Sequence, residues 1–355
     1  LAPRFGLAWS PRGSRRTVVR ASYGLHYDYP QANHYRDLLS GNGQRQLSFT
    51  ITGGGAGAPV YPNFPGSPAG IASVRSSITI TDPNLSWMYV HQGQVGVERE
   101  LAADLALSVT YALTKATKIP VSQNINLAPA VGTLADGRAL YSTARLDARF
   151  NNINMITAAG NSSYNGLGVN LNKRFRRGWQ MNLSYTWSHA LDNAPEPGIS
   201  GGGESPQDTY NRRAEWGNSL SDVRHVLNGS AVFRPWFRNR VLDNNQLALF
   251  FFARSGGTFD VRSGTDLNRD SVNNDRPLFF GRNTGKGPAS AQLDVRYSRI
   301  FRLRERRRVE WMVESANVFN TPLADSTNGA INRVFGAGAT PVATFGQVIA
   351  RHEMR

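Results

Sequence analysis

The chain has 355 residues, a formal net charge of +15 at pH 7, 35 glycines, 18 prolines and no cysteine. The absence of cysteine excludes disulfides and thiolate metal sites. Its apolar runs, such as 247–253, are far shorter than the ~20 residues of a membrane-spanning helix, so a helical membrane protein is excluded. Many glycines and prolines favour an all-β chain rich in turns.

Segments in which apolar and polar residues alternate recur along the whole chain. Such alternation is typical of β-strands, because successive side chains leave opposite faces of the strand. In chain order we expect about twelve strands, at 5–9, 19–27, 47–51 (weakly), 87–97, 105–113, 152–157, 167–175, 179–192, 227–233, 247–253, 293–303 and 309–313.

The segment 179–192 shows the pattern most clearly. One parity carries Trp179, Met181, Leu183, Tyr185 and Trp187, and the other carries Gln180, Asn182, Ser184, Thr186 and Ser188. In a soluble core the tryptophans and the tyrosine would need polar partners for their N–H and O–H groups. A membrane barrel supplies these partners at the headgroup layer, and its inner face is wet.

The connections between the expected strands alternate in length. Short turns lie at 10–16, 100–104, 175–178 and 302–308, and long polar loops at about 30–45, 52–84, 116–148, 192–223, 256–290 and 320–344. This order predicts an antiparallel up-and-down transmembrane β-barrel with short periplasmic turns and long extracellular loops. A β-sandwich or a propeller is the alternative, although either would distribute its loop lengths more evenly.

On such a barrel the apolar parity faces outer-membrane lipid. We predict lipid contact for Trp179, Leu183, Tyr185, Trp187, Leu107, Val109, Tyr111 and Trp311. The arginine-rich turns are either solvated or contact anionic phospholipid headgroups. Because these charges are spread over separate turns, we expect no nucleic acid partner.

Several segments resemble the Oar-like branch of the TonB-dependent outer-membrane receptors. They include "LAPRFGLAWSP", "TVVRASYGLHYD", "GQVGVERELAADLALSVTYALTKAT", "NSSYNGLGVNLNKRFRRGWQMNLSYTWSHALDNA", "SPQDTYNRRAEWG", "SDVRHVLNGSAVF" and "FRLRERRRVEWMVESANVFNTP". The resemblance implies a 22-stranded barrel filled by an N-terminal plug, located in the cell outer membrane of a diderm bacterium. Residues 1–355 would supply about 12–14 strands of this one β-barrel domain.

The resemblance also implies partners outside this sequence. The TonB complex would pull on a short N-terminal box, and an unidentified extracellular solute would be bound or transported. The plug, the TonB box, a carboxypeptidase-regulatory-like domain and the closing strand are expected to be missing from the sequence.

Two short motifs resemble catalytic or phosphate-binding signatures, and neither is convincing. "GISGG" (198–202) fits G-x-S-x-G but has no strand before it and no helix after it. "GRNTGKG" (281–287) has one residue too few between its first two glycines for a phosphate loop. We therefore expect no enzyme activity and no organic cofactor.

The segment "TDLNRDSVNNDRP" (265–277) is the one candidate for a metal site. Asp266, Asn268 and Asp270 stand at alternate positions, as in calcium loops, and Asp275 follows. Ser271 replaces the usual turn glycine, and Pro277 stands where a calcium loop has its last glutamate. Calcium binding and a plain turn rich in Asp and Asn both stay open.

Three functions remain open from the sequence. The first is TonB-dependent uptake or binding of a solute through an outer-membrane receptor. The second is a surface adhesion or structural protein that uses the barrel as an anchor without active transport. The third, a secreted all-β enzyme or glycan-binding module, conflicts with the aromatic residues on the apolar parity.

Overall fold

The computed structural model describes residues 2–14, 16–29, 38–43, 75–194, 206–234, 243–303, 307–321 and 331–349. Its regular structure is almost entirely β, with 3-10 turns at η1 (Pro11–Gly13) and η3 (Arg212–Glu215). Among these residues no helix is both long and apolar enough to cross a membrane.

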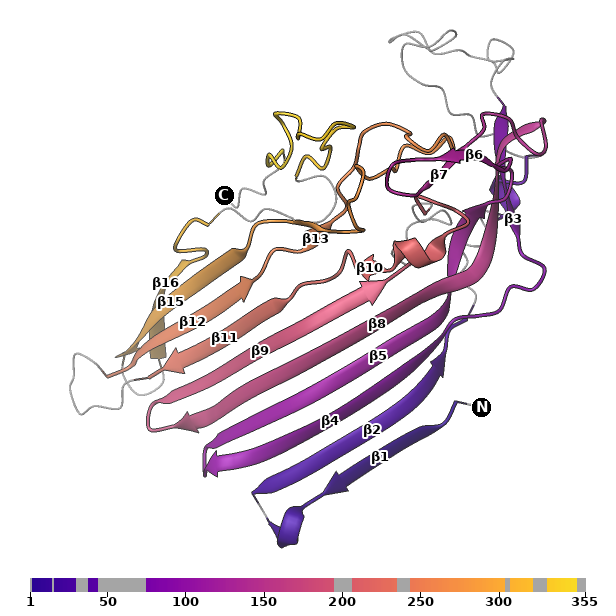
Figure 1. Ribbon diagram of the computed structural model, residues 1–355. Helices are drawn as coiled ribbons and strands as arrows, with labels where there is room; N and C mark the ends of the chain where they lie inside the picture. The colour runs from indigo at the N-terminus through magenta and orange to yellow at the C-terminus, as the bar shows by residue number, and fades with distance from the viewer. Residues whose placement is uncertain are drawn as a thin grey trace.

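One 12-stranded sheet dominates the molecule (Figure 1). Its antiparallel path runs through β1 (Arg4–Trp9), β2 (Thr17–Tyr27), β4 (Tyr89–Ala102), β5 (Leu105–Asn124), β8 (Phe150–Arg176), β9 (Trp179–Asp192), β11 (His225–Phe233), β12 (Asn245–Arg254), β15 (Ser290–Leu303) and β16 (Arg307–Ser315). Off this path, β3 (Ser76–Thr81) pairs parallel to β8, and β10 (Gly217–Asn218) pairs with β9. Two small two-stranded sheets are separate from it, β6 (Ala130–Thr133) with β7 (Ala139–Tyr141) and β13 (Thr258–Phe259) with β14 (Gly285–Lys286).

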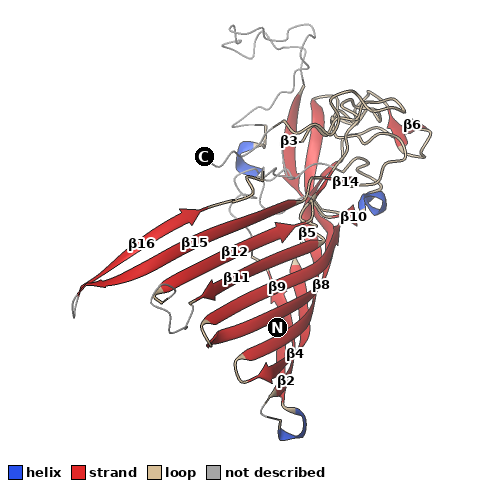
Figure 2. Cartoon of the chain, turned by 90° about the vertical axis from the view of Figure 1, so that its left-hand side faces the viewer, coloured by secondary structure: helices blue, strands red, loops and turns tan. Residues whose placement is uncertain are grey.

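The predicted up-and-down order is confirmed, because each strand of the path pairs with its predecessor and its successor. The sheet curves across its width from β16 to β2 (Figure 2). In the described part of the chain β1 and β16 end the path and do not pair with each other, so the sheet is an open section of barrel wall.

The predicted alternation of connection lengths is also confirmed. The turns between β1 and β2, β4 and β5, and β8 and β9 are short and lie at one end of the sheet (Figure 1). At the β8–β9 turn, Arg177 and Gly178 have φ of 54° and 83°, the left-handed pair that a tight type I′ hairpin requires. The described parts of the long connections lie at the opposite end.

Three strand predictions were wrong in their limits. The segments 152–157 and 167–175 belong to one strand, β8, because the polar stretch between them stays extended. β5 continues to Asn124 through residues predicted as loop, and β3 lies within the predicted loop 52–84. The weak prediction at 47–51 lies outside the described residues.

Strand register gives the sheet one apolar and one polar face. One row of directly opposed residues reads Val19, Val97, Val109, Val169, Tyr185 and Leu227, and a neighbouring row reads Glu98, Ser108, Asn170, Ser184 and Asn228. Opposed residues of an antiparallel pair share a face, so the two parities stay separate across the sheet.

Buried apolar clusters lie at the end with the long loops and not between the ten strands of the path. One contains Ala116, Ile119, Val121 and Ala194, and the other contains Phe259, Val261 and Ile331. The strands themselves leave large apolar side chains exposed, including Val97, Tyr111 and Trp187. Such an exposed apolar face requires a nonaqueous neighbour.

Candidate functional site: a polar loop cluster at one end of the sheet

Three long connections pack against one another at the end of the sheet opposite the short turns (Figure 1). We call the described residues of 125–149, 206–224 and 255–289 the loop cluster. The backbone N–H of Tyr141 donates to the carbonyl oxygen of Asn268 at 2.8 Å, and the Tyr141 hydroxyl donates to Asp208 at 2.6 Å. All three residues are buried, so these bonds join the three connections at one point.

A buried ionic centre joins two of these connections, 206–224 and 255–289, a second time. The Arg276 guanidinium donates to both carboxylate oxygens of Glu215, at 2.8 and 3.1 Å, and lies 3.7 Å from Asp260. Arg276 is 4% exposed and Glu215 5%. Burial raises the pKa of Asp260, although the charge of Arg276 opposes this. A buried arginine held by two oxygens fixes the relative position of the loops that carry it.

A second arginine, Arg138, reaches across from the hairpin β6–β7. Its guanidinium donates to Asp136 at 2.7 Å and to Asp275 at 3.0 Å. The other oxygen of Asp275 accepts the backbone N–H groups of Leu267 and Asn268. Asp275, one of the four predicted calcium ligands, thus has both oxygens engaged in holding the cluster together.

The predicted calcium loop adopts a tightly wound conformation. Asp266 accepts backbone N–H groups from Arg269, Asp270 and Ser271. Ser271 has φ of 71°, so it takes the left-handed conformation of the glycine that it replaces. Among the described residues, no group of three or more His, Cys, Asp or Glu side chains is placed to hold a metal. Calcium binding through Asp266, Asn268 and Asp270 stays a prediction, with the Asn268 amide needed as a ligand.

The buried carboxyl of Asp270 should make the stability of this loop depend on pH. Burial raises its pKa to about 7, and the charges of Asp266 and Asp275 add to the effect. Because the unfolded value is about 4, its contribution to stability is complete below about pH 4 and is lost as the pH rises through about 7. We measure this by hydrogen exchange of the 266–272 amides, corrected for intrinsic rates. We expect their protection to weaken as the pH rises from about 4 through about 7.

The variant Asp270→Asn should remove that dependence. Restoration of protection by calcium at alkaline pH would support the calcium hypothesis, because a bound cation favours the ionised carboxylates. Equal pH dependence in the variant and the parent would show that another group controls the loop.

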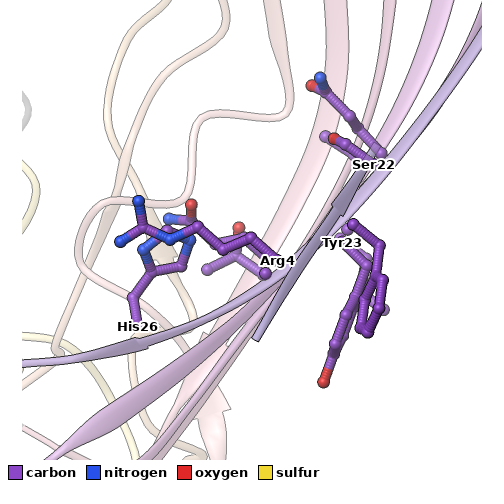
Figure 3. Close-up of a pocket in the computed structure, with 12 residues that line it drawn as sticks. Arg4, Ser22, Tyr23 and His26 are labelled. Atoms are coloured by element: carbon purple, nitrogen blue, oxygen red, sulfur yellow. The ribbon is translucent and has the colours of Figure 1, made fainter. Parts of the chain in front are cut away.

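The polar face of the sheet has a hollow of about 440 Å³ at β1, β2, β4 and β5. Arg4, Ser22 and His26 line it, and Figure 3 shows Arg4 and His26 on one side of the sheet with Tyr23 on the other. Gly24 makes room for the imidazole, because a Cβ there would lie 2.8 Å from Nε2 of His26. The hollow offers hydrogen-bonding groups to a solute or to another polypeptide on the polar face.

The eight residues predicted to contact lipid share one face. Leu107 is joined to Leu183 through Leu171, Val109 to Tyr185 through Val169, and Tyr111 to Trp187 through Leu167. Directly opposed residues on β11, β12 and β15 connect Trp179 to Val313 on β16. Trp311 is two positions from Val313 on the same strand and therefore lies on the same face. Their common face is therefore a finding, whereas their contact with lipid stays a prediction.

The two short motifs differ in outcome. "GISGG" lies outside the described residues. In "GRNTGKG", Gly285 and Lys286 form β14 and pair with β13, so the segment supplies one strand of a small two-stranded sheet. It does not precede a helix, as a phosphate loop would.

Sequence reasoning missed the arginines that organise the loop cluster. Arg138, Arg276 and Arg282 each contact carboxylates from a distant part of the chain, Arg282 reaching Asp192. In the sequence each is a loop arginine with no periodic pattern, so no local signal distinguishes it from a solvated one.

Comparison with known proteins agrees with this architecture. The family described as "Outer membrane beta barrel domain" matches residues 1–281. No curated protein sequence matches this chain.

Among solved structures, the outer membrane transporter YddB from Escherichia coli has a TM-score of 0.55 at 11% identity, covering 91% of this chain and 37% of the other. A mutant of the ferric enterobactin receptor PfeA from Pseudomonas aeruginosa has a TM-score of 0.53 at 14% identity, covering 98% and 38%. The FrpB iron transporter from Neisseria meningitidis (F3-3 variant) has a TM-score of 0.50 at 13% identity, covering 95% and 37%. The chain therefore spans less than two fifths of these similar structures, and at such identities the likeness concerns the fold.

Proposed function

Because this chain belongs to the outer membrane beta barrel domain family, whose members lie in the outer membrane of Gram-negative bacteria, we propose that it forms part of the barrel of a TonB-dependent receptor. In this role it binds an extracellular solute and passes it through the barrel with energy supplied by the TonB complex. The Oar-like branch is the proposed subfamily, on the motifs quoted above.

The observation that carries the proposal is the loop cluster. Three long connections are fixed to one another by buried ionic and hydrogen bonds, at the same end of a wall whose other end has tight turns. An anchor for adhesion needs no such rigid rim, whereas a receptor needs a preformed outer surface that positions a solute above the barrel. The transporters and receptors with similar folds support the same choice.

We further propose that the apolar face contacts lipid and that the short turns face the periplasm. The arginine-rich turns then lie near the inner-leaflet headgroups. At the β8–β9 turn, however, Lys173 is held by Asp104 at 2.7 Å and by the carbonyl oxygens of Arg174, Arg176 and Trp179. This lysine stabilises the turn and is not available to a phosphate, so any phospholipid contact there falls to the arginines.

Energy dependence of uptake tests the proposed function. Cells with and without the full-length gene would be compared for accumulation of a panel of radiolabelled ferric chelates, before and after collapse of the proton motive force. We expect gene-dependent accumulation of at least one chelate that disappears when the proton motive force is collapsed. Gene-dependent surface binding that survives this treatment, without accumulation, would favour the barrel-anchored adhesion protein instead.

A further inference from the structure

The apolar face carries a compact group of aromatic and cationic side chains near the end of the long loops. We call it the aromatic–lysine patch, and it consists of Tyr23, Tyr27, Tyr89, His91, Lys115 and Lys118. The Tyr23 hydroxyl and Nδ1 of His91 are 2.6 Å apart. The rings of Tyr27 and Tyr89 are 6.0 Å apart, and those of Tyr89 and His91 are 5.5 Å apart. These contacts join the four rings into one unit across β2 and β4.

The patch stands where the apolar face ends. On β5 this face presents Leu105, Leu107, Val109, Tyr111 and Leu113, and the next position is Lys115, which is directly opposite His91. Leu105 and Lys115 are ten positions apart. That separation is ~33 Å along a strand and ~25 Å along the barrel axis at the usual tilt, which is the height of the apolar band of a membrane barrel.

Lys118 reaches this patch through an irregularity in β5. By simple alternation an even-numbered residue of β5 belongs to the polar face, with Thr110 and Thr114. The register shifts between Thr117 and Ile119, and Lys118 has φ of 61°, in the left-handed region that is unusual for lysine. Its ammonium lies 5.8 Å from the centre of the Tyr89 ring. The bulge therefore turns a second lysine toward the aromatic rings of the apolar face.

The charge of the patch is positive and locally uncompensated. The chain has four lysines, and two of them, both exposed, are in the patch. The apolar-face positions of β2, β4 and β5, all within the described part of the chain, carry neither Asp nor Glu. Two ammonium groups beside hydroxyl and imidazole groups, at the edge of an apolar band, suit an amphiphile with an anionic head and acyl chains.

We propose that the aromatic–lysine patch binds the phosphorylated glycolipid of the outer leaflet, lipopolysaccharide, through a phosphate of its lipid A. Lys115 and Lys118 contact the phosphate, the rings of Tyr27, Tyr89 and His91 contact the sugar, and the acyl chains lie on the leucines and valines below. This site rests on the proposed orientation, in which the apolar face meets lipid and the long loops are extracellular. Its ligand is separate from any transported solute, since the patch is on the other face from the hollow of Figure 3.

The test is a titration of the purified full-length protein, extracted from outer membranes in mild detergent and stripped of bound lipid. The probes are bisphosphorylated lipid A, the same glycolipid without phosphates, and phosphatidylglycerol, with binding followed by thermophoresis. We expect Lys115→Gln/Lys118→Gln to bind bisphosphorylated lipid A about 25-fold more weakly, since each cation near a headgroup contributes a factor of about five. Lys286→Gln, which removes an exposed lysine of the loop cluster, should bind as the parent does, and Lys115→Arg should retain binding.

Three results would overturn the proposal. They are unchanged binding by the double variant, equal binding of the glycolipid without phosphates, and equally tight, lysine-dependent binding of phosphatidylglycerol, which would assign the site to a phospholipid. Gel mobility of unheated and boiled samples keeps this test separate from the proposed function. If the parent protein shows no mobility shift on boiling, the closed barrel on which the proposed function rests is refuted, whereas a normal shift with lysine-independent binding refutes the glycolipid site alone.

Discussion

Replacing Arg276 with methionine should open the loop cluster while leaving the strands intact. The substitution leaves Glu215 and Asp260 buried without their main cation, and removing one partner of a buried ion pair typically costs about 3–5 kcal/mol. The cost should appear as a lower free energy of local opening for amides of 206–222 and 258–285, measured by native-state hydrogen exchange in detergent. Amides in the middle of β5 and β8 should keep their protection, because Arg276 contacts neither strand.

Two further variants sharpen this prediction. Arg149→Met removes an arginine whose side chain is 78% exposed and which pairs with Asp147, so it should leave the local opening of the cluster nearly unchanged, because water screens an exposed pair. Arg276→Met/Glu215→Met removes both charges of the buried pair and should recover part of the loss, since apolar replacements of buried pairs are often tolerated. If Arg276→Met and Arg149→Met opened the cluster equally, the buried ionic centre would not be what holds the connections 206–224 and 255–289 together.

The barrel wall was predictable from the sequence because its determinants are local. Alternation over five or more residues identifies a strand that is wet on one face, and the alternation of short and long connections gives the up-and-down order. Both signals depend only on the order of residues along the chain. Strand limits were harder to predict in the polar middle of β8, because no apolar parity marks the strand there.

The loop cluster was not predictable, because its contacts join residues far apart in the chain. Arg276 and Glu215 are 61 positions apart, and Arg138 and Asp275 are 137 apart. Nothing near either residue in the sequence indicates its partner. The loop 265–277 was singled out for its alternate acidic residues, yet the structure shows Asp275 neutralised by a distant arginine, which spacing alone could not reveal.

Lys118 shows how a single backbone irregularity changes the face to which a residue belongs. Strict alternation assigns it to the polar face, and only the register shift and its positive φ place its ammonium beside Tyr89. Phe250 and Phe252 are exceptions of another kind, since they follow the parity of Asn182 and Asn228 and so put aromatic rings on the polar face. At such positions the alternation of residues along the sequence does not give the face to which a side chain belongs, and the structure is needed to assign it.

The assignment of the apolar face to lipid predicts opposite results for two adjacent substitutions on β9. Leu183 is opposite Leu171 and Gly229 on the apolar face, and Asn182 is opposite Asn172 and Ser230 on the polar face. An arginine on the lipid face near the bilayer midplane costs about 2–4 kcal/mol, whereas one facing the lumen is solvated. We therefore expect Leu183→Arg to reduce the folded fraction in bilayers strongly and Asn182→Arg to reduce it little, as measured by equilibrium unfolding in vesicles.

The same two variants compared in water, without a bilayer, would not discriminate between the faces, because both faces would then meet water. The bilayer is therefore the essential component of this experiment. Leu183 is more than a third exposed, at 36%, so an arginine there meets no protein neighbour that it would displace from a core. Its cost must then come from the medium outside the sheet. Equal losses for Leu183→Arg and Asn182→Arg would mean that both faces meet the same medium, and the orientation on which the receptor and the glycolipid site both depend would be wrong.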